Sequence, residues 1–279
     1  MAYEFQSLAV RVERGVAWVT IDNPPINLFD LVLMRDMDAF GREVENDEAV
    51  RAIVFQSANP EFFIAHADIE LIQRMPTTPP PRPERPSFFQ AMCDRFRTMP
   101  KATIAKIEGC ARGGGSEFSL SLDMRFAALG RAVLGQPEVA IGIIPGGSGT
   151  QRLPRLLGRS RALEIVLGCD DFDAATAERY GYVNRALPPD ELGPFVERLA
   201  YRIASFPAEA IALAKAAVVA ADDLSTTEGL VEEAHNFNLS VATAGAQTRM
   251  RRAMELGAQT RDVELTLGAL FDRMQGGES

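Results

Sequence analysis

The chain has 279 residues and a mass of 30.4 kDa, and 47% of its residues are hydrophobic, which is enough to bury one large core. The formal net charge of -9 and the sequence pI of about 4.9 disfavour non-specific binding to nucleic acid. Neither value excludes an anionic ligand, because a few Lys or Arg side chains are sufficient for a local site.

The cysteines and histidines form no pattern typical of a disulfide framework or a metal centre. Cys93, Cys110 and Cys169 lack a CxxC spacing and their number is odd, which favours a reducing compartment. His66 and His235 lie far apart and outside an HExxH motif. The N-terminus lacks the features of a signal peptide, and no apolar run is long enough for a membrane span. We therefore expect a cytoplasmic protein without a metal site.

The beginning of the chain predicts a hairpin and then a helix. Residues alternate between apolar and polar over 8–12, Arg14 and Gly15 favour a turn, and 16–21 continue as a strand. Apolar side chains then recur at helical spacing, which predicts an amphipathic helix over 31–46.

Two later apolar segments, 52–55 and 103–107, are short and suited to buried strands. The segment 76–86 between them holds six prolines in eleven residues, which excludes a helix or a central strand and predicts a loop. This loop either borders a ligand pocket or is a solvated insertion.

From about Pro207 the pattern is helical throughout. The Ala- and Leu-rich segments 207–220, 225–243 and 246–257 follow one another without a strand between them. We therefore expect a mixed β/α core over 1–205 and an all-helical region over 206–279.

The first glycine-rich segment, 109–117, lies between the predicted strand 103–107 and an apolar helix over 118–122. Its three consecutive glycines permit close approach of a ligand, and a helix N-terminus favours developing negative charge. The same segment is also compatible with a tight strand-to-helix connection. It matches neither GxxxxGK[ST] nor GxGxxG, so a nucleotide-phosphate loop is disfavoured.

The second glycine-rich segment, 135–150, contains a Pro-containing turn before a helix that starts near Ser148. Ser148 does not lie in a GxSxG motif, because position 150 is Thr, and a serine hydrolase is therefore disfavoured. Glu117 and Glu138 are each compatible with an ordinary surface position. Together, one at a glycine-rich helix start and one beside a turn, they suggest an acid/base pair.

Four motifs, in order and spacing, resemble the signatures of the crotonase (enoyl-CoA hydratase/isomerase) superfamily. The similarity extends from the first hairpin to about residue 205, with a looser helical match to about residue 257. The motifs are FFIAHADI at 62–69, GGGSE at 113–117, GQPE at 135–138 and PGGSGTQRL at 145–153.

The resemblance implies a fold, an assembly and an activity. The fold is an α/β class with a crotonase-like ββα spiral core over 1–205 and a C-terminal helical trimerisation region over 206–279. The assembly is a homotrimer or a dimer of trimers. The activity is that of an enoyl-CoA hydratase, a lyase of fatty acid metabolism. Its partner is an acyl-CoA substrate, and no separate cofactor is expected because coenzyme A is part of the substrate.

The resemblance also implies the roles of individual residues. The backbone N–H groups of Ala67 and Gly114 would form an oxyanion hole, which stabilises the charge of a thioester enolate. Glu117 would hold and activate the water that adds at C3, and Glu138 would exchange the proton at C2. Gly146 would help to hold the water.

Further residues are assigned by the same resemblance. Gln136 would support the second carboxylate, and the segment around the oxyanion hole would bind substrate through Ala65, His66, Asp68 and Ile69. His66 stands where the family usually has Gly, so its side chain either contacts the thioester region or points away from it. Glu70 replaces a common Lys, which leaves four other candidates for the coenzyme A phosphates: Lys101, Arg74, Arg82 and Arg85.

Two alternatives remain at this level. One is another crotonase-type lyase, isomerase or decarboxylase that uses a single glutamate; the presence of both glutamates favours the hydratase. The other is a non-catalytic, RNA-binding member of the superfamily. The acidic net charge and the lack of a Lys/Arg-rich helix disfavour that binding function.

Overall fold

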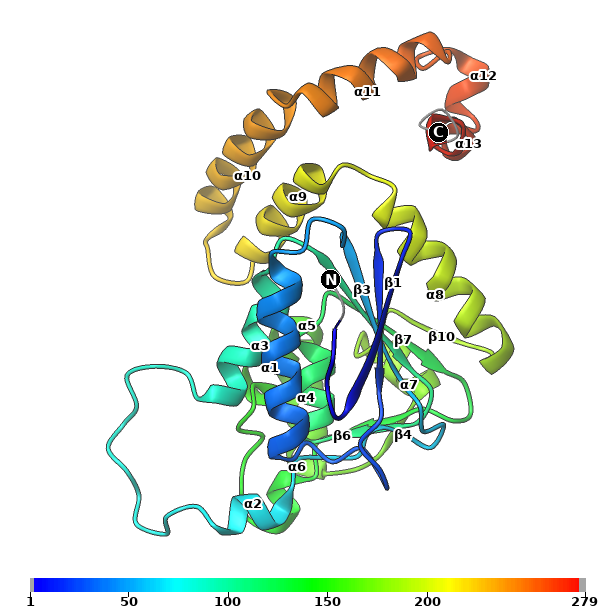
Figure 1. Cartoon of the computed structure of the whole chain (residues 1–279). Coiled ribbons are helices and arrows are strands. Elements are labelled where there is room, and N and C mark those ends of the chain that lie inside the picture. Colours follow the sequence, from blue (N-terminus) through cyan, green and yellow to red (C-terminus); the bar gives the residue numbers. More distant parts are fainter. Residues whose placement is uncertain (1–2, 276–279) are drawn as a thin grey trace. The chain divides into compact units, whose positions relative to one another are not determined.

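A computed structural model describes residues 3–275, and the chain divides into two compact units, Met1–Ala204 and Ser205–Ser279 (Figure 1). Among the described residues, every strand belongs to the first unit and the second unit is helical. The boundary lies one residue before the predicted one.

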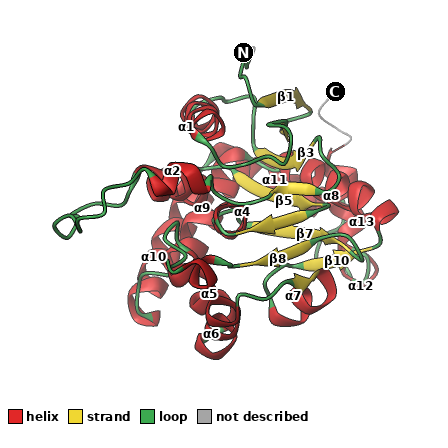
Figure 2. Ribbon diagram, turned by 90° about the horizontal axis from the view of Figure 1, so that it is seen from below, coloured by secondary structure: helices red, strands yellow, loops and turns green. Residues whose placement is uncertain are grey.

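The larger sheet of the first unit has six strands in the order β1-β2-β3-β5-β7-β10. The β1 and β2 strands pair antiparallel, and the other neighbouring strands pair parallel, side by side in Figure 2. The inner strands β2, β3, β5 and β7 are mostly apolar and buried over most of their length, as is typical of parallel strands covered on both faces. The strands are β1 (Leu8–Glu13), β2 (Val16–Ile21), β3 (Ala52–Ser57), β5 (Ala102–Ile107), β7 (Met124–Ala128) and β10 (Arg185–Leu187).

A smaller sheet has four short strands in the order β4-β6-β8-β9, namely β4 (Phe62–Ile64), β6 (Cys110–Arg112), β8 (Val133–Gly135) and β9 (Phe172–Asp173). The β3, β5 and β7 strands of the larger sheet are each followed by a strand of the smaller sheet, and then by helix. This repeating order is the expected ββα spiral, and it confirms the α/β fold class.

The helices of the first unit complete each turn of the spiral. They are α1 (Leu31–Glu45), α2 (Ile69–Gln73), α3 (Phe88–Thr98), α4 (Gly114–Leu120), α5 (Gly149–Leu157), α6 (Arg159–Gly168), α7 (Ala174–Tyr180) and α8 (Pro189–Ala204), with the 3₁₀-helix η1 (Glu138–Ile141) before α5. Residues 76–86 form the expected loop, which is exposed throughout and extends away from the core of the unit (Figure 1).

The hairpin prediction is confirmed, since Arg14 and Gly15 take φ angles of 50° and 79°, as a tight two-residue turn between twisted strands requires. The helix predicted from Phe118 begins four residues earlier, at Gly114. The glycine-rich segment is therefore itself the first turn of α4, and it places Glu117 inside the helix.

A cluster of phenylalanine rings fixes α4 in the core. Phe118 makes edge-to-face contacts with Phe55 and Phe96, at centroid distances of 5.1 Å and 5.6 Å. It also contacts Phe29 at 5.7 Å. Such pairs contribute about 0.5–1.5 kcal/mol each beyond their buried area. Since Phe118 directly follows Glu117, this packing anchors the backbone at the first glutamate.

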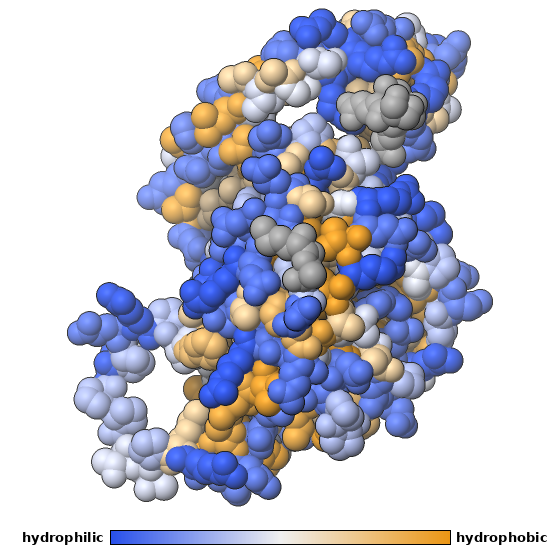
Figure 3. All heavy atoms as spheres, in the orientation of Figure 1, coloured by the Kyte–Doolittle hydropathy of each residue, from blue (hydrophilic) through white to orange (hydrophobic). Residues whose placement is uncertain are grey.

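The second unit contains the three predicted helices and two short ones. They are α9 (Ala208–Ala220), α10 (Thr226–Val241), α11 (Ala244–Glu255), α12 (Arg261–Glu264) and α13 (Leu267–Gln275). Several large apolar side chains of this unit are exposed, and apolar spheres are visible over α10 in Figure 3. No single helix among residues 3–275 is long and apolar enough to cross a membrane, although α8 and α9 taken as a pair have sufficient length and apolar composition.

Candidate active site

Glu117 is a buried carboxylate that accepts hydrogen bonds from a backbone turn. Its side-chain Oε1 accepts from Gly147 N and from Gly149 N, both at 2.8 Å. The residue is only 3% exposed, and burial raises the pKa of its carboxyl group. The N–H groups of residues 147–149 and the positive charge of Arg152 lower this pKa and partly offset the burial.

Glu138 is buried without comparable partners. It begins η1, is 8% exposed, and its Oε2 has no hydrogen-bond partner in the described part of the chain. Burial raises the pKa of Glu138 to about 7, and the negative charge of Glu117 adds to this effect. A carboxyl group with this pKa can gain or lose a proton near neutral pH.

Gly113 allows the Glu138 carboxylate to approach the start of α4. Its φ angle is +47°, and a Cβ at this position would lie 2.6 Å from Glu138 Oε1. Any other residue would therefore be strained and would displace the carboxylate. The first glycine of the GGGSE motif is therefore needed both for its backbone conformation and for the space that the Glu138 carboxylate occupies.

Ala67 and Gly114 lie side by side, as the predicted oxyanion hole requires. A Cβ built on Gly114 would be 3.1 Å from Ala67 Cβ and 3.3 Å from Ala67 N. Phe29 and Ala67 form a parallel β-bridge, in which Phe29 N donates to His66 O and Asp68 N donates to Phe29 O. Neither hydrogen bond uses the Ala67 N–H. Gly114 is the first residue of α4, where an N–H has no acceptor within the helix.

The predicted substrate-binding segment serves in part to build this local structure. Ala65 is buried. Asp68 caps α2, because its Oδ1 accepts from Glu70 N at 2.9 Å. Ile69 is 42% exposed and starts α2. Of these three residues, Ile69 is the most exposed, Asp68 is intermediate and Ala65 is buried.

His66 is half-buried beside the two N–H groups. Its Nδ1 lies 2.8 Å from Ala67 O, so the ring is held against the backbone of the next residue. Its Cβ would lie 3.6 Å from a Cβ on Gly113. The side chain therefore starts next to the glycine that faces Glu138.

Gln136 has different contacts from those predicted. It is fully buried, and its Nε2 donates to Ser116 Oγ at 3.1 Å, while its Oε1 has no hydrogen-bond partner among the described residues. The Ser116 hydroxyl also shares a hydrogen bond with Tyr182. Gln136 therefore supports Ser116, the residue before Glu117, through its Nε2, and no hydrogen bond joins it to Glu138 in the described part of the chain.

Gly146 is exposed and precedes the turn that binds Glu117. Gln90, on α3, donates from Nε2 to Gly146 O at 2.8 Å. This hydrogen bond connects α3 to the loop before α5. It fixes the backbone at the position for which a water-holding role is predicted.

One of the four candidates for a phosphate contact is wrong. Lys101 is 6% exposed, and its Nζ donates to the carbonyl oxygens of Asp47 and Val50, at 2.8 Å and 2.7 Å. This lysine is therefore used to satisfy backbone carbonyls inside the core. The other three candidates are exposed: Arg74, Arg82 and Arg85.

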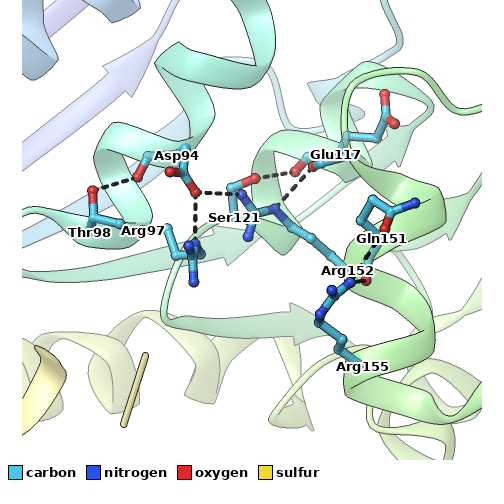
Figure 4. A network of polar contacts seen from close by, with 9 residues as sticks. Asp94, Arg97, Thr98, Glu117, Ser121, Gln151, Arg152 and Arg155 are labelled. Carbon is cyan, nitrogen blue, oxygen red and sulfur yellow. Dashed lines mark hydrogen bonds and ion pairs between the residues drawn. The ribbon is translucent and has the colours of Figure 1, made fainter. Parts of the chain in front are cut away.

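Sequence reasoning missed the residues that surround Glu117. A Cβ on Gly147 would lie 2.4 Å from Glu117 Oε2 and 2.5 Å from Phe89 Cε1, so the Phe89 ring edge stands beside the carboxylate. Arg152 pairs with Asp94 at 3.3 Å in the network of Figure 4. The PGGSGTQRL motif contains Arg152, but its contact with α3 appears only in three dimensions.

The chemistry available to these groups is proton transfer and stabilisation of an oxyanion. Residues 3–275 contain no group of three or more His, Cys, Asp and Glu side chains placed to hold a metal ion. Two buried carboxyl groups with different surroundings suit general acid–base catalysis. Two adjacent N–H groups suit a carbonyl oxygen that gains negative charge.

Comparison with known proteins identifies relatives over most of the chain. Residues 11–259 match the family model described as enoyl-CoA hydratase/isomerase. The short-chain-enoyl-CoA hydratase of Clostridium acetobutylicum is 32% identical, and the match covers 90% of this chain and 96% of the relative. The crotonyl-CoA hydratase of Syntrophomonas wolfei is 33% identical over 91% of this chain and 96% of the relative.

A solved structure has the same fold. The enoyl-CoA hydratase of Bacillus anthracis superposes with a TM-score of 0.82 at 27% identity, covering 90% of this chain and 96% of that chain. The similarity therefore includes both the spiral core and much of the helical region.

Proposed function

Since this chain belongs to the enoyl-CoA hydratase/isomerase family, we propose that it is an enoyl-CoA hydratase that reversibly converts 2,3-enoyl-CoA thioesters to 3-hydroxyacyl-CoA. The observation that carries the proposal is the pair of buried glutamates, Glu117 and Glu138, beside the adjacent N–H groups of Ala67 and Gly114. Relatives that are named as hydratases of short-chain enoyl-CoA and crotonyl-CoA support it.

In the proposed reaction the thioester oxygen accepts hydrogen bonds from the N–H groups of Ala67 and Gly114. Ionised Glu117 takes a proton from a water molecule, whose oxygen then bonds to C3 of the enoyl group. The electron pair of the double bond moves onto the thioester as an enolate, and the protonated carboxyl of Glu138 supplies the proton to C2. Proton exchange with solvent restores both carboxyl groups. The loss of one oxyanion donor typically lowers the rate by about 10²–10³.

The different surroundings of the two carboxyl groups support these roles. Glu117 receives backbone hydrogen bonds that favour its ionised form, as a base requires. Glu138 lacks a partner on Oε2, and its pKa of about 7 keeps a proton available near neutral pH. A reaction that uses a single glutamate would leave the second buried carboxyl group without a function.

The decisive experiment for the proposal is turnover of crotonyl-CoA by the purified full chain. We expect the enoyl absorbance to fall near neutral pH as 3-hydroxybutyryl-CoA forms. A series of enoyl thioesters of increasing chain length measures the preferred acyl group. Absence of hydration with both short and long thioesters would contradict the proposed function, and release of CO₂ or movement of the double bond would identify another reaction of the family.

We also propose that the helical unit assembles the chain as a homotrimer or a dimer of trimers. Exposed apolar side chains on its helices support this proposal: Val218 is 74% exposed, Val231 69% and Phe237 65%. Sedimentation equilibrium measures the mass of the assembly. We expect three or six chains, and we expect Phe237→Glu to lower the mass; a monomeric wild-type chain would contradict the assembly.

A further inference from the structure

The turn that binds Glu117 has an unfavourable backbone conformation at Ser148. This residue has φ 129° and ψ -1°, in a region that residues with a side chain rarely adopt. The conformation allows Gly147 N and Gly149 N, on either side of Ser148, to reach the same oxygen of Glu117. Strain of this kind costs on the order of 1–3 kcal/mol and persists only where neighbouring groups hold it.

A side chain from the next helix contacts this turn. Arg152 Nε donates to Ser148 Oγ at 3.0 Å, from one turn further along α5. The hydrogen bond ties the Ser148 side chain to the body of the helix. It therefore opposes rotation of Ser148 into a relaxed conformation, in which the two neighbouring N–H groups would no longer converge.

The guanidinium group of Arg152 is itself held in place by α3. Its Nη2 lies 3.3 Å from Asp94 Oδ1, and the same oxygen accepts from Arg97 Nε at 2.7 Å. The Arg152 side chain is 15% exposed. Figure 4 shows it extending from α5 toward Asp94, while the Glu117 carboxylate points away from it. Among the described residues, the hydrogen-bond partners of Arg152 are Ser148 and Asp94, and Arg152 therefore acts on Glu117 through the turn.

We propose that Arg152, anchored by Asp94, is a positioning residue that holds the strained Ser148 turn so that two N–H groups bind the Glu117 carboxylate. This inference rests on the proposed function only for its kinetic consequences, because the geometry of the turn exists without substrate. The positive charge of Arg152 also lowers the pKa of Glu117, in the same direction as the two hydrogen bonds.

Other charged or titratable groups interact electrostatically with Glu117 or with the residues around it. Burial and the hydrogen bonds of the turn are the main influences on Glu117 itself. The remaining groups come from η1, from α3 and from the segment after α7. They are Glu138, Cys93, Asp94 and Tyr182.

The first test is kinetic. Arg152→Gln is expected to lower kcat for crotonyl-CoA hydration by about 10–10² with little change in KM, because misplacement of a catalytic group affects the chemical step. The acidic limb of the kcat profile is expected to move to higher pH, since the loosened turn stabilises ionised Glu117 less well. Arg155→Gln is the matched control, because Arg155 is exposed on the same helix.

Substitution of Ser148 distinguishes positioning from a purely electrostatic effect. Glycine adopts a φ of 129° without strain, so Ser148→Gly needs no anchor from Arg152. We expect the double variant Ser148→Gly/Arg152→Gln to recover most of the activity lost in Arg152→Gln. Arg152→Lys, which keeps the charge and loses the guanidinium, is expected to remain impaired. No recovery in the double variant, or full activity with Lys, would overturn the proposal.

The second test does not require activity. In protein labelled with ¹⁵N-glycine, the amide signals of Gly147 and Gly149 are expected to shift as Glu117 ionises, with a higher midpoint in Arg152→Gln. Asp94→Asn gives a smaller change in the same direction and serves if Arg152→Gln does not fold. Identical midpoints in wild type and variants would overturn the positioning role. A wild-type chain that hydrates no enoyl thioester yet shows these shifts would contradict only the proposed function.

Discussion

The two glutamates of the site are both buried, but they differ in their hydrogen-bond partners and in the charges near them. Two backbone N–H groups of a turn donate hydrogen bonds of 2.8 Å to Glu117, and the partly buried Arg152 contacts this turn. On the Glu138 side, the carboxylate packs against Gly113 and one oxygen has no partner in the described structure. Burial is similar, at 3% and 8% exposure, so the difference between the two groups comes from their hydrogen bonds and neighbouring charges.

This difference shows how one small site can provide both an acid and a base. Burial raises the pKa of both carboxyl groups. The hydrogen bonds to Glu117 partly offset that increase, whereas burial raises the pKa of Glu138 to about 7. Two carboxyl groups with such different hydrogen-bond partners are suited to opposite roles in one reaction.

The largest effect is expected from removal of either ionisable group. Glu117→Gln and Glu138→Gln should each lower kcat for crotonyl-CoA hydration by about 10²–10⁴, the usual contribution of a general acid or base. Circular dichroism and coenzyme A binding check that the fold and the site persist. Near wild-type activity in one variant would remove that glutamate from the mechanism and favour a reaction with a single carboxyl group.

The next effect is expected from filling the space beside each carboxylate. A Cβ on Gly147 would lie 2.4 Å from Glu117 Oε2, and one on Gly113 would lie 2.6 Å from Glu138 Oε1. Gly147→Ala and Gly113→Ala should therefore each lower kcat by about 10–10², through displacement of one carboxylate.

Two other glycines provide matched controls for these substitutions. Gly168 and Gly130 have nothing within 4 Å of an added Cβ, and Gly130 shares the positive φ of Gly113. Steady-state kinetics should show Gly168→Ala and Gly130→Ala close to wild type. Equal losses in the controls and the site variants would contradict a specific role for the space at the glutamates.

A third effect concerns stability and its dependence on pH. Because the pKa of Glu138 rises from 4.5 to about 7 in the folded chain, folding retains a proton that the unfolded chain releases. The free energy of unfolding should therefore fall as pH rises through this window, by on the order of 3 kcal/mol. Glu138→Gln has no carboxyl group to ionise at this position, so its free energy of unfolding should not fall in this way. The variant should therefore be more stable than wild type at pH 8.

Urea unfolding at pH 5 and pH 8 measures this difference. The gain from Glu138→Gln should be largest at pH 8 and should shrink toward pH 5. Glu84→Gln, in the exposed loop 76–86, is the control and should show no gain. A variant that is destabilised equally at both pH values would show that Glu138 is not strained by its burial.

The smallest effect is expected at the Gly146 loop. Gln90→Ala removes the 2.8 Å hydrogen bond to Gly146 O and should lower kcat by only a few-fold, at a cost of about 1 kcal/mol. Gln151→Ala removes an exposed amide from α5 and should have no effect on kcat. A loss as large as that of a glutamate variant would contradict a secondary role for the Gln90–Gly146 hydrogen bond.

The sequence predicts the fold well where local signals agree. The Arg14-Gly15 turn, the buried strand segments and the helices after Pro207 all appear at or near their predicted positions. Each depends on a pattern within a few residues of the chain, such as turn chemistry or apolar periodicity. The helix at Gly114 starts earlier than its apolar pattern, because glycines carry no periodic signal.

The candidate site is predicted less completely, since its details depend on contacts between distant segments. The motifs that contain Glu117 and Glu138 are visible in sequence, and the resemblance to a family pairs them. The hydrogen bonds from residues 147–149 and the Asp94–Arg152 pair join segments 30 and 58 residues apart. For Lys101 the prediction of a phosphate contact is wrong, because this lysine is buried and donates hydrogen bonds to backbone carbonyl oxygens.

The most direct measurement is the separate titration of the two carboxyl groups. Nuclear magnetic resonance of protein labelled with ¹³C at the glutamate side-chain carboxyl carbons follows each group, and Glu117→Gln and Glu138→Gln assign the two signals. We expect the Glu138 signal to titrate near pH 7 and the Glu117 signal to titrate at lower pH. The reverse order, or two ordinary titrations near the usual glutamate pKa, would contradict this expectation.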